Sequence, residues 1–325
     1  MNIGIVGSGK IVNTCLEAIN NIENINCNAI YVREKSYHKG LELSKKFNIK
    51  KIYTNYDEML NDSSIDFIYI GIINPLHYEY TKKALENNKN VICEKPFTKN
   101  SNELKELVNL AKSKHLFLFE AITTLYSPNF IYLKENINKI GNIKIIQCNY
   151  SQYSSRYDDY LNKIVLPAFD PKLYGGALYD INVYNIHIVI NLFGMPNSIK
   201  YNANLGFNGI DTSGILTLTY NDFIAVCIGA KDSDSPSFVT IQGEKGYLQI
   251  DDSPNECKSI KGIINNTLIS YSYNKYENRM TYEFIEFYNI FNSKNYNKCY
   301  EYLEHSINVM DILTTASNQI NLFKE

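Results

Sequence analysis

The stretch that decides the fold is IGIVGSGKI, residues 3–11. A short apolar strand runs directly into Gly7 and Gly9, and a helical pattern follows over residues 10–20. In a dinucleotide-binding fold the first glycine permits a tight turn, and the second lets the backbone approach a pyrophosphate at the helix N-terminus. The usual third small residue is replaced here by Val12, and a structural turn explains many isolated GxG loops. The position between an N-terminal strand and a helix nevertheless favours a dinucleotide site.

Strands and helices alternate over the first part of the chain. The predicted strands are 3–6, 29–32, 52–53, 67–71, 91–93 and 116–120, and the predicted helices are 10–20, 37–47, 56–61, 77–87 and 101–113. Such alternation is typical of a parallel sheet with helices on both faces. We therefore predict an α/β chain whose residues 1–120 form a doubly wound Rossmann domain.

The pattern changes near residue 121, where β-type runs follow one another without helices between them. These runs are 143–151, 198–205, 213–220, 223–230, 237–243 and 246–251. One helix, 176–194, interrupts them, and two helices near 278–293 and 299–322 close the chain. Residues 121–325 are thus predicted to form an α+β domain with a large, mostly antiparallel open sheet, joined to the first domain by a hinge near 120–128.

Composition and charge exclude several classes of function. The 325 residues carry a net charge of −2, whereas nucleic-acid-binding domains usually have a basic surplus. No apolar run is long enough to span a membrane, and the N-terminus lacks the pattern of a signal peptide. The 7 cysteines are scattered and never spaced as CxxC, which argues against a disulfide scaffold or a metal site. We expect a cytoplasmic protein that binds neither nucleic acid nor membranes.

The end of the second predicted strand bears on the choice of cofactor. An NAD site usually has an acidic residue there for the ribose 2′-hydroxyl, but this chain has Val32 followed by Arg33. A guanidinium suits a 2′-phosphate, and Lys39 is placed to reach the same group. Glu34 weakens this reasoning, and both cations are also explained as solvated surface residues. The pattern favours NADP(H), with NAD(H) as the alternative.

Four further motifs occur in a fixed order: INPLHYEYTKKAL at 73–85, NVICEKPFT at 90–98, FEAITTLYSP at 119–128 and GGALYDINVYNIH at 175–187. Together with the glycine loop, they resemble the glucose–fructose oxidoreductase / inositol dehydrogenase / rhizopine-catabolism (Gfo/Idh/MocA) family. The resemblance covers nearly the whole chain and is closest to the branch that contains dihydrodiol dehydrogenase. It implies an NAD(P)-dependent oxidoreductase of sugars, polyols and related alcohols.

The resemblance also implies roles for residues of the first domain. Lys95 is expected to be catalytic, to contact the nicotinamide ribose and to touch the substrate oxygen, with Glu94 positioning it or the ribose. The remaining cofactor contacts are expected from Gly7, Gly9, Lys10, Ile11, Arg33, Lys39, Asn74 and His77. Two alternatives stay open, namely that Glu94 and Lys95 are an ordinary surface pair before a turn and that Asn74 merely caps a helix.

The predicted helix at 176–194 carries a narrow polar stripe. At about 100° per residue, Asp180, Tyr184, His187 and Asn191 fall within an arc of about 60° on an otherwise largely apolar helix. Asp180 and Tyr184 match catalytic positions of the family. A phenol beside a lysine cation has a lowered pKa, so Tyr184 would exchange a proton with the substrate alcohol while Asp180 binds or orients it. His187 is either a substrate contact or a core histidine.

Two departures from the family pattern concern the substrate. Asn182 replaces the usual glycine of the D-x-G motif, and Leu125 stands where many relatives have arginine. Arg156, in the aromatic and hydroxyl-rich segment YSQYSSRYDDY, is the candidate replacement for that cation, although the segment equally suits a sheet edge.

Three functional hypotheses remain. The first is an oxidoreductase acting on a sugar-like or cyclic polyol substrate. The second is a catalytically silent NAD(P)- or sugar-binding regulator of the same fold, and the third is an enzyme that retains its nicotinamide and recycles it between two substrates. The resemblance further implies a homodimer or homotetramer formed through the C-terminal sheet.

Overall fold

The structure is a computed structural model that describes residues 1–323, in which the chain forms two compact units. The first unit comprises residues 1–122 and 276–307, and the second comprises residues 123–275 and the chain from residue 308 onward. The last two residues of the predicted second domain, 324 and 325, lie outside the described residues. The division into domains 1–120 and 121–325 stays a prediction.

A six-stranded parallel sheet organises the first unit. Its strands are β1 (Asn2–Val6), β2 (Asn26–Tyr31), β3 (Lys51–Tyr53), β4 (Phe67–Ile70), β5 (Asn90–Glu94) and β6 (Leu118–Ala121). Their order is β3-β2-β1-β4-β5-β6, which is the order of a doubly wound dinucleotide-binding sheet. The residues of β4 are all buried, as expected for a strand covered on both faces. The predicted Rossmann sheet is confirmed.

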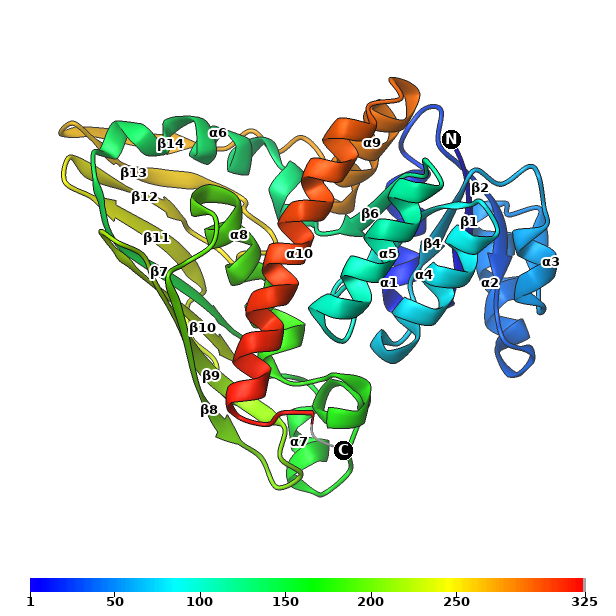
Figure 1. The fold of residues 1–325 in the computed structure, drawn as a ribbon, viewed down its shortest axis with the longest axis horizontal. Coiled ribbons are helices and arrows are strands. Elements are labelled where there is room, and N and C mark those ends of the chain that lie inside the picture. Colours follow the sequence, from blue (N-terminus) through cyan, green and yellow to red (C-terminus); the bar gives the residue numbers. More distant parts are fainter. Residues whose placement is uncertain (324–325) are drawn as a thin grey trace. The chain divides into compact units, whose positions relative to one another are not determined.

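Helices cover this sheet on its two faces (Figure 1). They are α1 (Lys10–Ile19), α2 (Tyr37–Phe47), α3 (Tyr56–Leu60), α4 (His77–Glu86), α5 (Ser101–Ser113) and α9 (Met280–Asn292). Within the unit α4 packs on α5, and α1 packs on α9. All five helices predicted before residue 120 are present.

An eight-stranded sheet organises the second unit. Its strands are β7 (Ile143–Ser151), β8 (Ser198–Leu205), β9 (Asp211–Thr219), β10 (Ile224–Ala230), β11 (Phe238–Gly243), β12 (Gly246–Ile250), β13 (Ile260–Ile264) and β14 (Thr267–Tyr271). The order is β14-β13-β12-β11-β7-β10-β9-β8. Only the pair β7 and β10 is parallel among these neighbours, so the predicted mostly antiparallel open sheet is confirmed.

Two elements of this unit carry local signals that the sequence analysis passed over. The hairpin β13–β14 turns at Asn265 and Asn266, which both have positive φ (48° and 65°), as a two-residue hairpin loop requires. Helix α6 (Pro128–Asn136) begins with Ser127, whose side chain accepts a hydrogen bond from Phe130 N at 3.2 Å. Proline at the first helical position completes a standard helix start.

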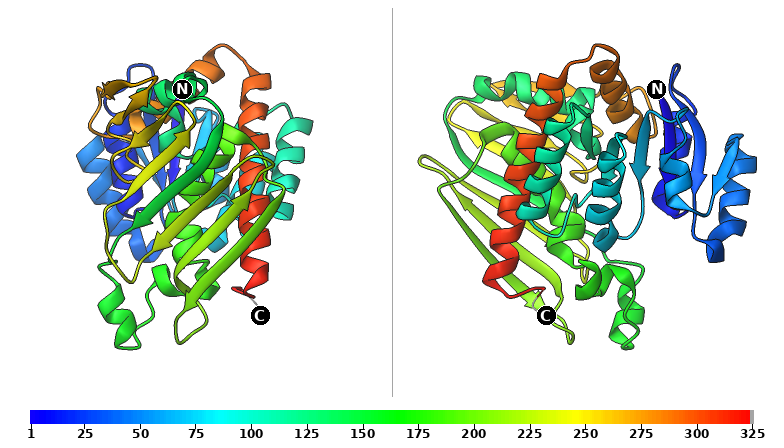
Figure 2. Two further views of the ribbon diagram at one scale, coloured as in Figure 1. Left: turned by 90° about the vertical axis from the view of Figure 1, so that its left-hand side faces the viewer. Right: turned by 45° about the vertical axis from the view of Figure 1, so that its right-hand side comes forward.

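Helices cover one face of the eight-stranded sheet. Helix α8 (Val183–Phe193) contacts β7 and β10 and is buried from Val183 to Ile190. The short α7 (Tyr157–Leu161) follows β7, and α10 (Tyr296–Gln319) closes the described chain. Figure 2 shows the sheet also from the side opposite α8, with its strands in front.

The predicted helix at 176–194 is not uniform. Residues Leu178–Asn182 form a π-helical turn, and the regular α-helix starts only at Val183. A π turn holds more residues than an α turn, so the assumption of 100° per residue is wrong over this segment. The 60° arc from Asp180 to Asn191 therefore does not describe the actual directions of these side chains.

Candidate functional site

The glycine loop has the geometry that its sequence predicts. Gly7 has φ of +117°, and a Cβ on this residue would lie 2.4 Å from Gly71 O, so only glycine fits the turn. Gly9 precedes α1, and a Cβ there would have no neighbour within 4 Å. The N-terminus of α1 thus faces open space, where its backbone N–H groups favour an anion.

The missing third glycine of the loop is compensated on the neighbouring strand. Val12 is fully buried in α1, and a Cβ on Gly71 would lie 2.9 Å from Val12 Cγ2. The glycine that lets helix and strand approach is therefore found at the end of β4 instead of in α1. Val12 therefore departs from the sequence motif, but α1 and the end of β4 remain closely packed.

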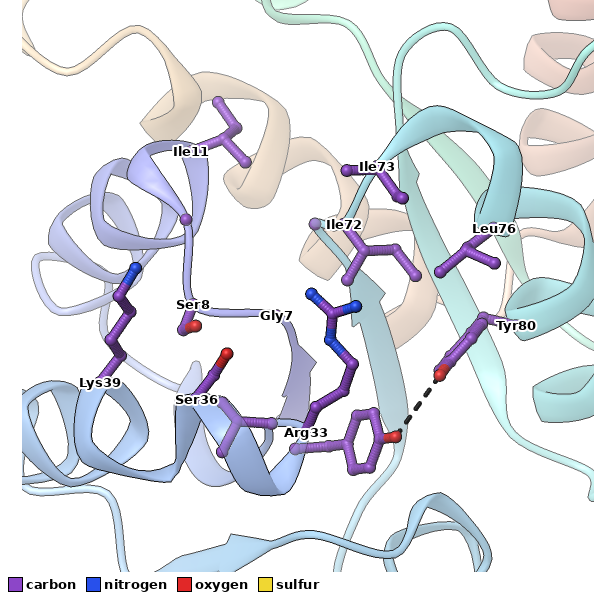
Figure 3. Close-up of a pocket in the computed structure, with 14 residues that line it drawn as sticks. Gly7, Ser8, Ile11, Arg33, Ser36, Lys39, Ile72, Ile73, Leu76 and Tyr80 are labelled. Carbon is purple, nitrogen blue, oxygen red and sulfur yellow. Dashed lines mark hydrogen bonds between the residues drawn. The ribbon is translucent and has the colours of Figure 1, made fainter. Parts of the chain in front are cut away.

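A cavity of about 360 Å³ lies over the glycine loop (Figure 3). Its lining comes from the ends of β1, β2 and β4, the segments that follow them, and helices α1, α2 and α4. The lining residues are Gly7, Ser8, Gly9, Ile11, Tyr31, Val32, Arg33, Ser36, Lys39, Gly71, Ile72, Ile73, Leu76 and Tyr80. Figure 3 shows Ser36 and Lys39 on one side, and Ile72, Leu76 and Tyr80 on the other, with Arg33 extending between them. The cavity combines apolar walls with cations and hydroxyls, as expected for a site that binds a nucleotide.

Five of the predicted cofactor residues line this cavity: Gly7, Gly9, Ile11, Arg33 and Lys39. The other five are not among the lining residues, namely Lys10, Asn74, His77, Glu94 and Lys95. The cavity also contains Tyr31 and Tyr80, whose hydroxyls are 3.4 Å apart, and Ser36, none of which was predicted from the sequence. A signal for Ser36 existed, since it is a hydroxyl three residues after Arg33 in the same loop.

Glu94 ends β5 as a buried residue. It is 7% exposed and accepts a hydrogen bond from Tyr69 Oη at 2.6 Å. Burial raises the pKa of Glu94, while the bond from Tyr69 and the charge of Lys95 act in the opposite direction. Lys95, which is partly buried, begins the turn with a cis peptide bond to Pro96. The structure therefore argues against an ordinary exposed Glu-Lys pair.

His77 connects two turns at the carboxyl edge of the sheet. Its ring is fully buried, with Nδ1 2.9 Å from Pro96 O and Nε2 3.1 Å from Ile72 O. Burial lowers the pKa of His77. These contacts give the residue a structural role, holding the turn after Lys95 against the loop after β4, and its contact with a cofactor stays a prediction.

The two adjacent glycines in the second unit have different structural causes. A Cβ on Gly175 would lie 2.7 Å from Pro167 O, whereas Gly176 faces a buried carboxylate. Gly176 has φ of +94°, and a Cβ there would lie 1.9 Å from Asp211 Oδ1. The other oxygen, Asp211 Oδ2, accepts hydrogen bonds from Leu178 N and Tyr201 Oη, both at 2.7 Å. Burial raises the pKa of Asp211 to about 6. Asp211 thus fixes the start of the helical segment that carries Asp180 and Tyr184.

Asp180 is held by a lysine that the sequence analysis did not consider. Lys231 Nζ donates to Asp180 Oδ2 at 2.7 Å and to Ala168 O at 2.7 Å. Only 4% of the Lys231 side chain is exposed, against 39% of that of Asp180. No spacing in the sequence relates these two residues, because they are 51 positions apart.

Tyr184 and His187 lie on the buried part of α8. Tyr184 is 8% exposed, and its ring centroid is 6.0 Å from that of Tyr150. His187 is fully buried, which agrees with the core alternative, although a substrate contact stays a prediction. Arg156 is an exposed residue just before α7, and its role also stays a prediction.

Asn182 is accommodated in the same way as Val12. A Cβ on Gly229 of β10 would lie 2.8 Å from Asn182 Cβ, so the strand provides the space that a glycine in the helix would have given. Asn182 Nδ2 donates to Cys227 O at 3.1 Å, and its Oδ1 accepts from Asn185 at 2.8 Å. The departure from the family motif therefore creates a buried hydrogen-bonded contact between helix and sheet.

Residues 1–323 contain neither a metal-binding cluster nor a membrane-spanning helix. Within that range no group of three or more His, Cys, Asp or Glu side chains is arranged to hold a metal ion. None of the described helices combines the length and apolarity needed to cross a membrane.

Known proteins similar to this chain share both parts of the fold. Residues 1–121 match the family described as "Oxidoreductase family, NAD-binding Rossmann fold" (GFO_IDH_MocA), and residues 132–249 match the "GFO/IDH/MocA C-terminal domain". The scyllo-inositol 2-dehydrogenase (NADP(+)) IolU of Bacillus subtilis (strain 168) is 37% identical over 251 residues, which cover 77% of this chain and 76% of that protein. The trans-1,2-dihydrobenzene-1,2-diol dehydrogenase of Xenopus tropicalis is 30% identical, covering 81% and 78%.

Solved structures with low sequence identity have the same fold. KijD10, a 3-ketoreductase from Actinomadura kijaniata in complex with NADP and TDP-benzene, superposes with a TM-score of 0.86 at 17% identity, covering 98% of this chain and 97% of that one. Levoglucosan dehydrogenase in complex with NADH and levoglucosan superposes with a TM-score of 0.84 at 16% identity, covering 100% of this chain and 98% of that one. The sequence matches show that this chain belongs to the Gfo/Idh/MocA family of oxidoreductases with an NAD-binding Rossmann fold.

Proposed function

We propose that this protein is an NADP(H)-dependent oxidoreductase that interconverts an alcohol and a carbonyl on a sugar-like or cyclic polyol substrate. The observation that carries the proposal is the cavity over the glycine loop, where Arg33 and Lys39 bring two cations to the end of β2. The 37% identical relative named as an NADP(+)-dependent scyllo-inositol dehydrogenase supports the same cofactor and substrate class.

The chain offers suitable groups for each part of the cofactor. The N–H groups at the start of α1, next to Gly9, would hold the pyrophosphate. Arg33, Ser36 and Lys39 would bind the 2′-phosphate, because a guanidinium, a hydroxyl and an ammonium all donate to phosphate oxygens. Asn74, His77, Glu94 and Lys95 are proposed to complete the site toward the nicotinamide ribose.

The bound nicotinamide would supply the acceptor or donor of a hydride at its C4 atom. The chain's own residues would handle the proton of the substrate hydroxyl. Tyr184 is proposed to take or give that proton, with the Lys95 ammonium stabilising the phenolate form, and Asp180 to orient the substrate through a neighbouring hydroxyl. The proposal requires all three side chains to reach one alcohol group, and Arg156 and His187 are further candidates for substrate contacts.

The test is turnover followed at 340 nm. Wild-type protein is mixed with NADP⁺ and a panel of cyclic polyols and sugars, and with NADPH and the corresponding carbonyl compounds. Tyr184→Phe and Lys95→Met should each lose at least about two orders of magnitude in kcat, as expected for removal of an acid–base group. Tyr184→Phe should change the affinity for NADPH far less. Tyr220→Phe is the matched control, because its hydroxyl donates only to a backbone carbonyl, Gly194 O, at the end of α8.

Two outcomes would contradict the proposal. Binding of NADPH without turnover across the whole panel would favour the silent regulator. Wild-type kcat in Tyr184→Phe would show that another group transfers the proton. Nicotinamide retained through purification would identify the third hypothesis, an enzyme that recycles its cofactor.

We also propose that the protein forms a homodimer or homotetramer through the eight-stranded sheet. Ile145 and Ile224 are register partners on β7 and β10, and both are exposed, as is Ile215 on β9. Exposed apolar residues gathered on one sheet face are typical of a protein interface. Light scattering of Ile145→Lys/Ile224→Lys should show smaller particles than the wild type, and an unchanged mass would exclude this face.

A further inference from the structure

We infer that Lys231 is a positioning residue for the proposed reaction, acting through Asp180. This inference rests on the proposed function, in which Asp180 orients the substrate alcohol. Lys231 is the buried member of the pair, whereas Asp180 is partly exposed. The side chain of Asp180 is 39% exposed, while its Oδ2 is held by the buried ammonium.

The surroundings of the Lys231 ammonium give it a defined position. Its Nζ donates to Asp180 Oδ2 and to Ala168 O, both at 2.7 Å, and lies 4.8 Å from the centroid of the Phe169 ring. A desolvated ammonium is strongly unfavourable unless it is paired and hydrogen-bonded, so these partners restrict the side chain to one place. A cation over an aromatic face adds a favourable electrostatic contact.

The backbone of Lys231 is fixed directly after the end of β10. Its N–H donates to Thr212 O at 2.8 Å, and its carbonyl accepts from Ser154 N at 2.9 Å. These bonds tie the residue to the beginning of β9 and to the loop that follows β7. Because both ends of the lysine are held, the ammonium fixes the direction of Asp180 and does not simply follow it.

Other charged and titratable groups lie near this pair in the fold or in the chain. Asp211 interacts electrostatically with Lys231 and is hydrogen-bonded to Tyr201. Asp232 follows Lys231 and accepts hydrogen bonds from Thr212 and Ser213. Tyr184 lies four positions after Asp180 at the start of α8. Removing the ammonium would therefore raise the pKa of Asp180 and of Asp211, since both carboxylates lose a neighbouring positive charge.

The experiment compares Lys231→Met and Lys231→Arg with the wild type. Lys261→Met serves as the control, because Lys261 also pairs with an aspartate, Asp251, but with 55% of its side chain exposed. We expect Lys231→Met to lower kcat at least about tenfold and to move the acid limb of the kcat/KM profile upward by roughly one pH unit. Lys231→Arg should restore most of the kcat and most of the position of the acid limb, and Lys261→Met should behave as wild type.

A second arm separates positioning from stability. If Lys231 acts through Asp180, Lys231→Met should cause no further loss of kcat in an Asp180→Asn background. A loss that persists in that background, or one that lacks the pH shift and is not restored by arginine, would overturn the inference in favour of a structural role. Wild-type kinetics in Lys231→Met would overturn the inference alone, whereas a wild-type protein without turnover would overturn the proposed function and the inference with it.

Discussion

The substitution Gly176→Ala tests how the helical segment carrying Asp180 is held in place. Gly176 has φ of +94°, and the added Cβ would lie 1.9 Å from Asp211 Oδ1. That carboxylate is fully buried and caps the segment through Leu178 N. The methyl group cannot be accommodated unless Asp211 or the backbone of the turn moves.

Two contributions set the expected loss of stability. An L-residue in a left-handed conformation costs about 1–2 kcal/mol. Displacing a buried carboxylate from its donors leaves polar groups unsatisfied, which costs about 1–3 kcal/mol for each group. Asp211 has two donors, Leu178 N and Tyr201 Oη. We therefore expect the free energy of unfolding to fall by at least about 3 kcal/mol, a large part of the 5–15 kcal/mol typical of a domain.

Urea unfolding measures this loss, with Gly209→Ala as the matched control. Gly209 also has a positive φ, +81°, but a Cβ there would meet no atom within 4 Å. The control thus contains the backbone strain without the collision, and we expect it to lose only about 1–2 kcal/mol. Equal losses in the two variants would refute the reasoning, because the contact with Asp211 would then carry no energy.

Three further predictions concern the cofactor cavity and the two buried carboxylates. Arg33→Ala should weaken NADP⁺ binding at least about tenfold in fluorescence titrations and leave NAD⁺ binding unchanged, because only NADP⁺ carries the 2′-phosphate. Lys35→Ala serves as the control, and equal weakening of NADP⁺ and NAD⁺ binding by Arg33→Ala would remove the case for Arg33. The pKa of Asp211 is raised from 3.8 to about 6 in the folded protein, so the folded state holds the proton more tightly than the unfolded state. The free energy of unfolding therefore decreases as the pH rises from about 4 to about 6. Asp211→Asn should abolish this pH-dependent loss of stability, which amounts to roughly 3 kcal/mol. The same pH dependence of unfolding in the wild type and in Asp211→Asn would contradict the assignment of the effect to Asp211. Tyr69→Phe should destabilise the protein by about 1–3 kcal/mol, because the buried Glu94 loses its 2.6 Å donor, and a change within 0.5 kcal/mol in urea unfolding would contradict this.

Much of the fold could be predicted from the sequence, and half of the predicted cofactor residues line the cavity. The glycine loop, the alternation of strands and helices, and the later β-type runs are local patterns with a direct physical cause in backbone geometry and periodic burial. They led to the Rossmann sheet, six of the eight strands of the second sheet, and Gly7, Gly9, Arg33 and Lys39 at the cavity. The hairpin at Asn265 was missed although its turn residues are a local signal, so that error lay in the interpretation.

Other features depend on contacts between residues far apart in the sequence, and only the tertiary structure decided them. Val12 and Asn182 weaken their motifs, yet each faces a glycine on a neighbouring strand, Gly71 and Gly229, which restores the close approach of helix and sheet. The pairing of Asp180 with Lys231 arises in the same way, from the end of β10 meeting a π-helical turn. A sequence motif records which residue occupies a position, whereas packing and charge compensation depend on the residue opposite, and only the folded chain determines which residue that is.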